Sequence, residues 1–198
     1  MTTGHTSPPS PGTWLREMTD GDCGAVAAIR VRGWQSAYRG LMPQAHLDAM
    51  DVGRETELRR ERLAEGGAVN LVAVAGPPGA PGTPGQEVVG WAVYGAYRED
   101  DGRRTRGGEL YAIYVLPGRT GAGTGGSLLA EVMARAAADG FPTLALWVLR
   151  ENTGARRFYE RAGFLPDGAA EDFDAGGLMV SEVRYVAALT PPPTPPGG

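Results

Sequence analysis

A glycine-rich turn, GRTGAGTGGS at residues 118–127, constrains the fold of this 198-residue chain more than any other feature. The segment before it, ELYAIYV at 109–115, has the aromatic and β-branched content of a strand. The segment after it carries a helical apolar stripe formed by Leu128, Leu129, Val132, Met133 and Ala136. Glycines let backbone N–H groups approach an anion, and the first turn of a helix adds further N–H groups and a partial positive charge. The sequence therefore predicts a strand–turn–helix unit that binds phosphate.

The composition argues against several classes of protein. No apolar run approaches the roughly 18–20 residues that a membrane helix needs. The first twelve residues have neither the basic nor the apolar region of a secretory signal. A net charge of −4 argues against a nucleic-acid groove, which would need clustered Lys and Arg. We therefore expect no membrane partner and no nucleic-acid partner.

The metal-binding and redox-active residue types are scarce. The two histidines, His5 and His46, are too few and too isolated to indicate a metal site, so we expect no metal. The single cysteine, Cys23, rules out an internal disulfide and suits a reducing, cytoplasmic setting.

Proline and glycine mark the ends of the folded region. Residues 1–12 and 190–198 are rich in both and cannot bury a core, so we expect disordered tails there. A third such stretch, at 76–86, lies between two apolar segments and is interpreted as an extended hairpin loop. The sequence thus predicts one domain at 13–189.

Hydrophobic patterning in that domain predicts an α/β layered fold with a mostly antiparallel front half. We expect a strand at 13–18, helices at about 20–38, after Pro43 and at 53–65, and strands at 68–75, 87–97 and 109–115. After the turn and its helix come a strand at 143–149, which is apolar on both faces, and a helix at 152–162. One or two closing strands follow, including 178–189.

Two nucleotide-binding motifs compete for the glycine turn. Residues 121–126 match the dinucleotide pattern G-x-G-x-x-G, but four residues separate them from Leu116 and the preceding strand is not the first of the chain. That arrangement disfavours a nicotinamide-dependent reductase. A Walker P-loop needs Gly-Lys-Ser/Thr, whereas Gly126 is followed directly by Ser127.

Two longer segments resemble the GNAT superfamily of N-acetyltransferases. ELYAIYVLPGRTGAGTGGSLL (109–129) looks like its central motif, and ALWVLRENTGARRFYERAGF (145–164) looks like the adjoining one. With WQSAYRGLMP (34–43), the similarity extends over most of the predicted domain. The resemblance implies a single-domain GNAT-like fold, a mixed central sheet with splayed parallel strands at 109–115 and 143–149, flanked by helices.

The resemblance also implies acetyl-CoA as cosubstrate and assigns its binding residues. The pantetheine arm would pair with the backbone of Ile113, Tyr114 and Val115 as an added strand does. Asn152 would hydrogen-bond the cosubstrate, cap its own helix, or do both. The pyrophosphate would lie on the amides of Gly121, Ala122, Gly123, Thr124, Gly125 and Gly126.

Two positions of the turn depart from the family pattern. The family usually has Gln or Arg where this chain has Thr120, and often Arg or Lys where it has Ala122. Because side-chain contacts to the phosphates are then missing, we expect weakened binding that depends on backbone amides. This departure supports an alternative function, a non-catalytic acyl-CoA sensor or interaction module.

Acetyl transfer to an amine requires removal of a proton from the ammonium group and donation of one to the leaving thiolate. Tyr159 is the candidate acid, because it lies on the same helix face as Asn152 and matches the family tyrosine that donates to the departing sulfur. Glu109 is the candidate base: it starts an otherwise apolar strand and shares a face with Tyr111, Ile113 and Val115 if no bulge intervenes.

The first half of the chain supplies the expected acceptor pocket. Trp34 and Tyr38 lie in the segment that lines this pocket in similar proteins, and their rings could enclose an amine by cation–π contact. The predicted function is transfer of an acetyl group to a primary amine of a small molecule or peptide, by direct attack in a ternary complex. Similar proteins often dimerise, so a homodimer is left open.

Overall fold

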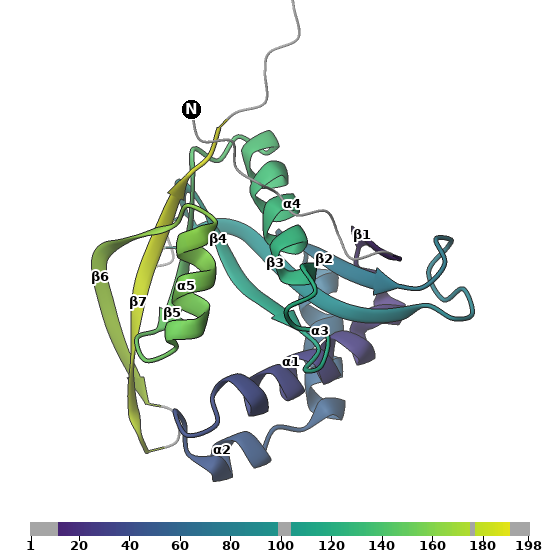
Figure 1. Cartoon of the computed structure of the whole chain (residues 1–198), viewed down its shortest axis with the longest axis horizontal. Coiled ribbons are helices and arrows are strands. Elements are labelled where there is room, and N and C mark those ends of the chain that lie inside the picture. The colour runs from purple at the N-terminus through teal and green to yellow at the C-terminus, as the bar shows by residue number, and fades with distance from the viewer. Residues whose placement is uncertain (1–11, 99–103, 175–176, 191–198) are drawn as a thin grey trace, which may run out of the picture.

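A mixed sheet of seven strands forms the centre of the protein, as Figure 1 shows. The computed structural model describes residues 12–98, 104–174 and 177–190. The strand order is β1-β2-β3-β4-β5-β7-β6; the β4–β5 pair is parallel and the other neighbouring pairs are antiparallel. The strands are β1 (Thr13–Glu17), β2 (Ala68–Ala75), β3 (Glu87–Arg98), β4 (Arg104–Val115), β5 (Thr143–Leu149), β6 (Leu165–Asp174) and β7 (Met179–Ala188).

Helices cover both faces of this sheet. Their bounds are η1 (Asp20–Asp22), α1 (Cys23–Ala37), α2 (Gln44–Asp48), α3 (Val52–Glu65), α4 (Thr124–Ala138) and α5 (Thr153–Arg161). Leu128 of α4 and Tyr159 of α5 belong to the larger core cluster on one face. Val26 of α1 and Leu63 of α3 pack with Trp91 on the other face. Within the described ranges, no helix is both long and apolar enough to cross a bilayer.

The element order agrees with the prediction, with one difference that bears on the site. β4 begins at Arg104, so the expectation that Glu109 starts its strand is wrong, and this carboxylate lies mid-strand. Residues 76–86 connect the antiparallel strands β2 and β3. The predicted tails at 1–12 and 190–198 lie almost wholly outside the described residues.

The parallel strands β4 and β5 separate soon after they meet. Their register contains two pairs, Gly108 with Leu144 and Glu109 with Ala145. Immediately beyond them, Leu110 pairs with Tyr94 and Ala112 with Val93 of β3, so Tyr111 is an extra residue in β4. Such a bulge bends its strand and increases the local twist. The bend turns β4 away from β5, as the splayed strands of the sequence-based expectation require.

A buried ion pair holds the start of α1 against β1. Asp22 is 7% exposed, and its carboxylate accepts hydrogen bonds of 2.6 and 2.8 Å from the Arg16 guanidinium. The Thr19 N–H and hydroxyl donate to it at 2.7 and 2.8 Å, which completes a capping box. Burial alone would raise the pKa of Asp22, but these bonds from Arg16 and Thr19 outweigh it and lower the pKa.

Removing this charge should destabilise the fold. Asp22→Asn leaves the Arg16 guanidinium with a weaker partner, and we expect the free energy of unfolding to fall by about 2 kcal/mol at pH 7. Because the folded-state pKa of Asp22 is lowered, its contribution is present above the unfolded-state pKa and is lost as the pH falls. The difference between variant and wild type in urea denaturation should therefore shrink below about pH 4.

The matched control is Asp20→Asn. Asp20 lies in the same turn, but its carboxylate is 75% exposed and 3.6 Å from Arg60, so the expected change is below about 0.5 kcal/mol. Equal losses in the two variants would contradict the assigned role of the Arg16–Asp22 pair.

Candidate active site

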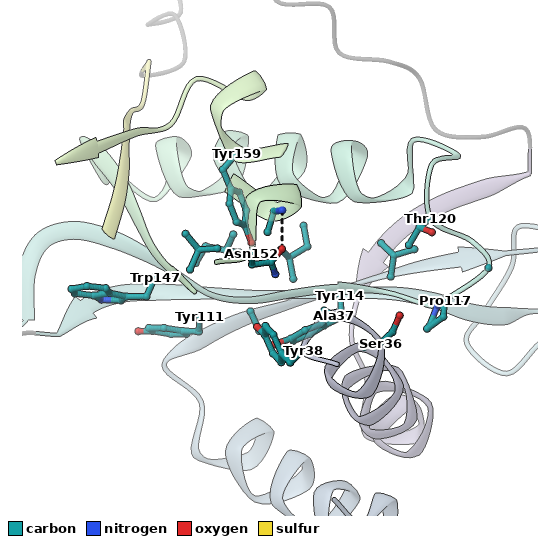
Figure 2. Close-up of a pocket in the computed structure, with 18 residues that line it drawn as sticks. Ser36, Ala37, Tyr38, Tyr111, Tyr114, Pro117, Thr120, Trp147, Asn152 and Tyr159 are labelled. Atoms are coloured by element: carbon teal, nitrogen blue, oxygen red, sulfur yellow. Dashed lines mark hydrogen bonds between the residues drawn. The ribbon is translucent and has the colours of Figure 1, made fainter. Parts of the chain in front are cut away.

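A cavity of about 350 Å³ lies where β4 and β5 separate. Leu110 to Val115 of β4 line one side, and Trp147 and Val148 of β5 line the other. Figure 2 shows Tyr159 reaching the cavity from one face of the sheet and Tyr38 lying on the opposite face. The cavity therefore connects the two faces of the sheet at its centre, so that two ligands entering from opposite faces can meet there.

The β5-facing edge of β4 offers main-chain groups to a ligand. Ile113, Tyr114 and Val115 pair with β3 on their other side, and no β5 residue of the described ranges is in register with them. All three line the cavity. An extended ligand can bond such an edge as an added strand does.

The ring of Tyr114 points away from that ligand path. It stacks on Trp91 with ring centroids 6.3 Å apart, and its hydroxyl accepts a 2.7 Å hydrogen bond from Trp34 Nε1. A Cβ at Gly33 of α1 would come within 2.8 Å of this ring, so the close approach of helix and strand requires glycine there. The backbone of Tyr114 is thus available to a ligand, while its side chain packs against α1 and holds that helix close to β4.

The glycine turn ends in a helix N-terminus. Gly121 and Gly123 have φ values of +81° and +87°, which glycine adopts without the strain of other residues. Gly123 is the N-cap of α4, and the first helical bond runs from Ser127 N to Gly123 O at 3.0 Å. Thr124, Gly125 and Gly126 therefore form the first helical turn, where backbone N–H groups point out of the helix toward an anion.

The turn fits a pyrophosphate group through its backbone. The Ser127 hydroxyl in the first turns of α4 is buried and has no hydrogen-bond partner in the described part of the chain. Thr120 lines the cavity and joins the turn to it. Arg119 lies 2.8 Å from Glu87 in an exposed ion pair. Glu87 partly neutralises its charge, so Arg119 attracts a phosphate less strongly than an unpaired arginine would.

Asn152 and Tyr159 occupy the face of α5 that borders the cavity. The Asn152 side chain accepts a 3.1 Å hydrogen bond from Ala155 N, so the N-cap role is observed. Tyr159 is 9% exposed, and its ring packs against Phe158 and Phe164 with centroids 5.2 and 5.9 Å away. Burial raises the pKa of this phenol, so it stays protonated near neutral pH and is competent as a proton donor.

Aromatic side chains border the opposite end of the cavity. Tyr38, Tyr111 and Trp147 all line it, and Figure 2 shows them below or level with the strand, away from Tyr159. Trp34 lies behind Tyr38, with ring centroids 4.9 Å apart in an edge-to-face contact. Of the two residues expected to bind the acceptor, the structure places Tyr38 at the cavity and Trp34 as its support.

Glu109 does not line the cavity. It lies where β4 and β5 are still paired, opposite Ala145, before the strands separate. The bulge at Tyr111 also breaks the alternation, so the condition for a face shared with Ile113 and Val115 is not met. The structure therefore does not bring Glu109 together with Tyr159 and Asn152.

Comparison with known proteins agrees with this geometry. The model of the Acetyltransferase (GNAT) family matches residues 42–164. The chain belongs to the GNAT family of acetyltransferases. The uncharacterized N-acetyltransferase YuaI of Bacillus subtilis is 28% identical over 170 residues, which cover 85% of this chain and 89% of that protein.

Solved structures of GNAT proteins share the fold. The PaiA N-acetyltransferase of Thermoplasma acidophilum, in complex with coenzyme A, has a TM-score of 0.64 at 17% identity, over 89% of this chain and 98% of its own. The YncA protein of Salmonella typhimurium, solved with its cofactor acetyl-CoA, has a TM-score of 0.64 at 20% identity. The match covers 94% of this chain and 99% of that chain. The predicted fold and enzyme class, an acetyl-CoA-dependent N-acetyltransferase, are confirmed.

The cavity is also lined by residues that the sequence analysis did not single out. Tyr111 and Trp147 line the cavity, yet in sequence each resembles an ordinary aromatic residue of a strand. Trp147 is the only aromatic residue of strand 143–149, and this is the one sequence feature that could have indicated a cavity beside β5. The bulge that exposes Tyr111 depends on pairing with β3, which no local sequence pattern reports.

Proposed function

We propose that this enzyme transfers the acetyl group of acetyl-CoA to a primary amine by direct attack in a ternary complex. The observation that supports this proposal is the cavity between β4 and β5. It joins the main-chain edge of β4 and Tyr159 on one face of the sheet to aromatic side chains on the other face. Thioester and amine entering from opposite faces meet without a protein nucleophile. The single cysteine, Cys23, is buried at the start of α1 and does not line this cavity.

The main-chain edge at Ile113 to Val115 would hold the pantetheine arm, and the first turn of α4 would hold the pyrophosphate. This arrangement directs the thioester toward Tyr159. A backbone N–H near Val115 would stabilise the negative charge that develops on the carbonyl oxygen. The cosubstrate would thus be positioned mainly by backbone groups, because Thr120 and Ala122 lack the long polar side chains that the family usually has at these positions.

Tyr159 would donate the proton that the departing sulfur takes up. As the neutral amine attacks, the C–N bond forms and the C–S bond breaks, and one proton released by the amine finally resides on the CoA thiol. The other proton of the original ammonium goes to a base and then to solvent. The raised pKa of the Tyr159 phenol keeps it in the donating form throughout the neutral range.

The proposal is tested by acetyl-CoA titration calorimetry followed by a thiol-release assay. The acceptors are spermidine, tyramine, kanamycin and a peptide with a free N-terminal alanine, which sample polyamines, aryl-alkyl amines, aminoglycosides and protein N-termini. We expect acetyl-CoA to bind and at least one amine to accelerate thiol release by about 100-fold over hydrolysis.

Two other outcomes are informative. Absence of acetyl-CoA binding would overturn the proposed site. Tight binding with no turnover on any acceptor would favour the alternative of a non-catalytic acyl-CoA sensor, to which the departures at Thr120 and Ala122 give some weight.

A further inference from the structure

A carboxylate of β7 lies beside the carboxyl end of β5. Glu182 pairs with Leu149, the last residue of β5, whose carbonyl accepts a 2.9 Å hydrogen bond from Asn152 N. Asn152 itself lines the cavity. Glu182 is therefore one strand away from the point where β5 ends and α5 begins, whereas Glu109 pairs with Ala145, four residues earlier in β5.

Glu182 faces the acceptor side of the sheet. Val183 and Tyr185 of β7 pack in the core beneath α4 and α5. Val180 packs with Leu47 of α2 in a cluster that Tyr38 also contacts. Because side chains alternate along a strand, Glu182 points to the same face as Val180. That face is the one from which Tyr38 approaches the cavity.

The charge of the Glu182 carboxylate affects the pKa values of two tyrosines that line the cavity. Burial is the main cause that raises the pKa of Tyr38, and the charge of Glu182 raises it further. The pKa of Tyr114 is likewise raised, first by burial and also by Glu182. Tyr38 and Tyr114 both line the cavity. The Glu182 carboxylate is thus electrostatically coupled to the acceptor end of the site from a different strand.

We propose that Glu182, which lies beside the cavity without lining it, accepts the proton of the acceptor ammonium through a bridging water, in place of Glu109. This inference rests on the proposed attack by a primary amine. The carboxylate takes one proton from the ammonium, the neutral amine then attacks the thioester carbon, and Glu182 returns its proton to solvent after the product leaves. The second amine proton goes to the thiol by way of Tyr159.

The electrostatic surroundings of Glu182 suit this role. Burial, with the like charge of Glu171 opposite it on β6, raises the pKa of Glu182 to about 7. Tyr38 and Tyr114 face it as neutral phenols. Arg184, two residues further along β7, is bonded to Asp167 and Tyr97 rather than to Glu182. A base with this pKa is ionised for much of the time near neutral pH and still binds a proton well.

The test is the pH dependence of kcat/KM for the panel amine with the highest turnover. In the wild type, kcat/KM should rise through a pKa of about 7. Glu182→Gln should lower it about 100-fold near pH 7 and move the rising limb toward the pKa of the free amine, near 10. The acetyl-CoA dissociation constant should stay within about two-fold, which separates the proton-accepting role from a structural one.

Two further variants make the test specific. Glu171→Gln removes the like charge, so the pKa of Glu182 should fall and the limb should move to lower pH. Glu109→Gln should leave the limb in place. The inference would be overturned if Glu182→Gln kept the wild-type pH dependence of kcat/KM, or if Glu109→Gln instead lost the rise of kcat/KM near pH 7. In either case, turnover by the wild type would still support the proposed function. Absence of wild-type turnover would overturn both.

Discussion

Replacing Tyr159 with Phe is expected to lower kcat about 100-fold while the acetyl-CoA dissociation constant changes less than about two-fold. The phenol is buried in the face of α5 that borders the cavity, and its removal leaves the thiolate to depart without a proton. The ring contacts with Phe158 and Phe164 are kept in the variant. Because burial raises the pKa of Tyr159, the loss should be the same at every pH in the neutral range.

Tyr185→Phe is the matched control for this variant. Tyr185 is a fully buried tyrosine of the same core cluster, and its hydroxyl donates a hydrogen bond to Glu160 and accepts one from Arg156, both in α5. It does not line the cavity. Its variant should lose about 1 kcal/mol of stability and keep its turnover. Equal kcat values for Tyr159→Phe and Tyr185→Phe would remove the acid role from Tyr159.

Local patterns predicted the elements of this site well because each depends on a few neighbouring residues. The turn at 118–127 placed the start of α4, since glycines tolerate positive φ and a helix follows at once. Asn152 and Tyr159 fell on one helix face because their spacing of seven residues is two turns of an α-helix. These features needed no knowledge of the sheet.

The carboxylates were harder to place because their positions depend on strand pairing. Glu109 appeared to begin a strand, but β4 starts at Arg104 and bulges at Tyr111 through its pairing with β3. Glu182 lies in a strand whose polar and apolar residues alternate, a pattern that is common in sheets and does not indicate a functional site. Glu182 lies beside Leu149 only because β7 is placed between β5 and β6 in the sheet.

The backbone dependence of cosubstrate binding leads to a second large effect. Gly123→Val should weaken acetyl-CoA binding about 100-fold, measured by calorimetry. Gly123 has φ +87° as the N-cap of α4, a conformation that costs a β-branched residue about 1–3 kcal/mol. The valine can escape this strain by rotating its backbone. That rotation turns the amides of Thr124 and Gly125 away from the pyrophosphate, and neither Thr120 nor Ala122 supplies a side chain that could compensate.

Gly140→Val separates loss of the binding geometry from general strain. Gly140 also has φ +87° and lies just beyond the other end of α4, with open space where a Cβ would be. Both variants should lower the melting temperature, but Gly140→Val should bind acetyl-CoA within about two-fold of the wild type. Comparable weakening in both variants would mean that the fold of α4 as a whole, rather than its N-terminal amides, determines affinity. Wild-type affinity in Gly123→Val would place the pyrophosphate elsewhere.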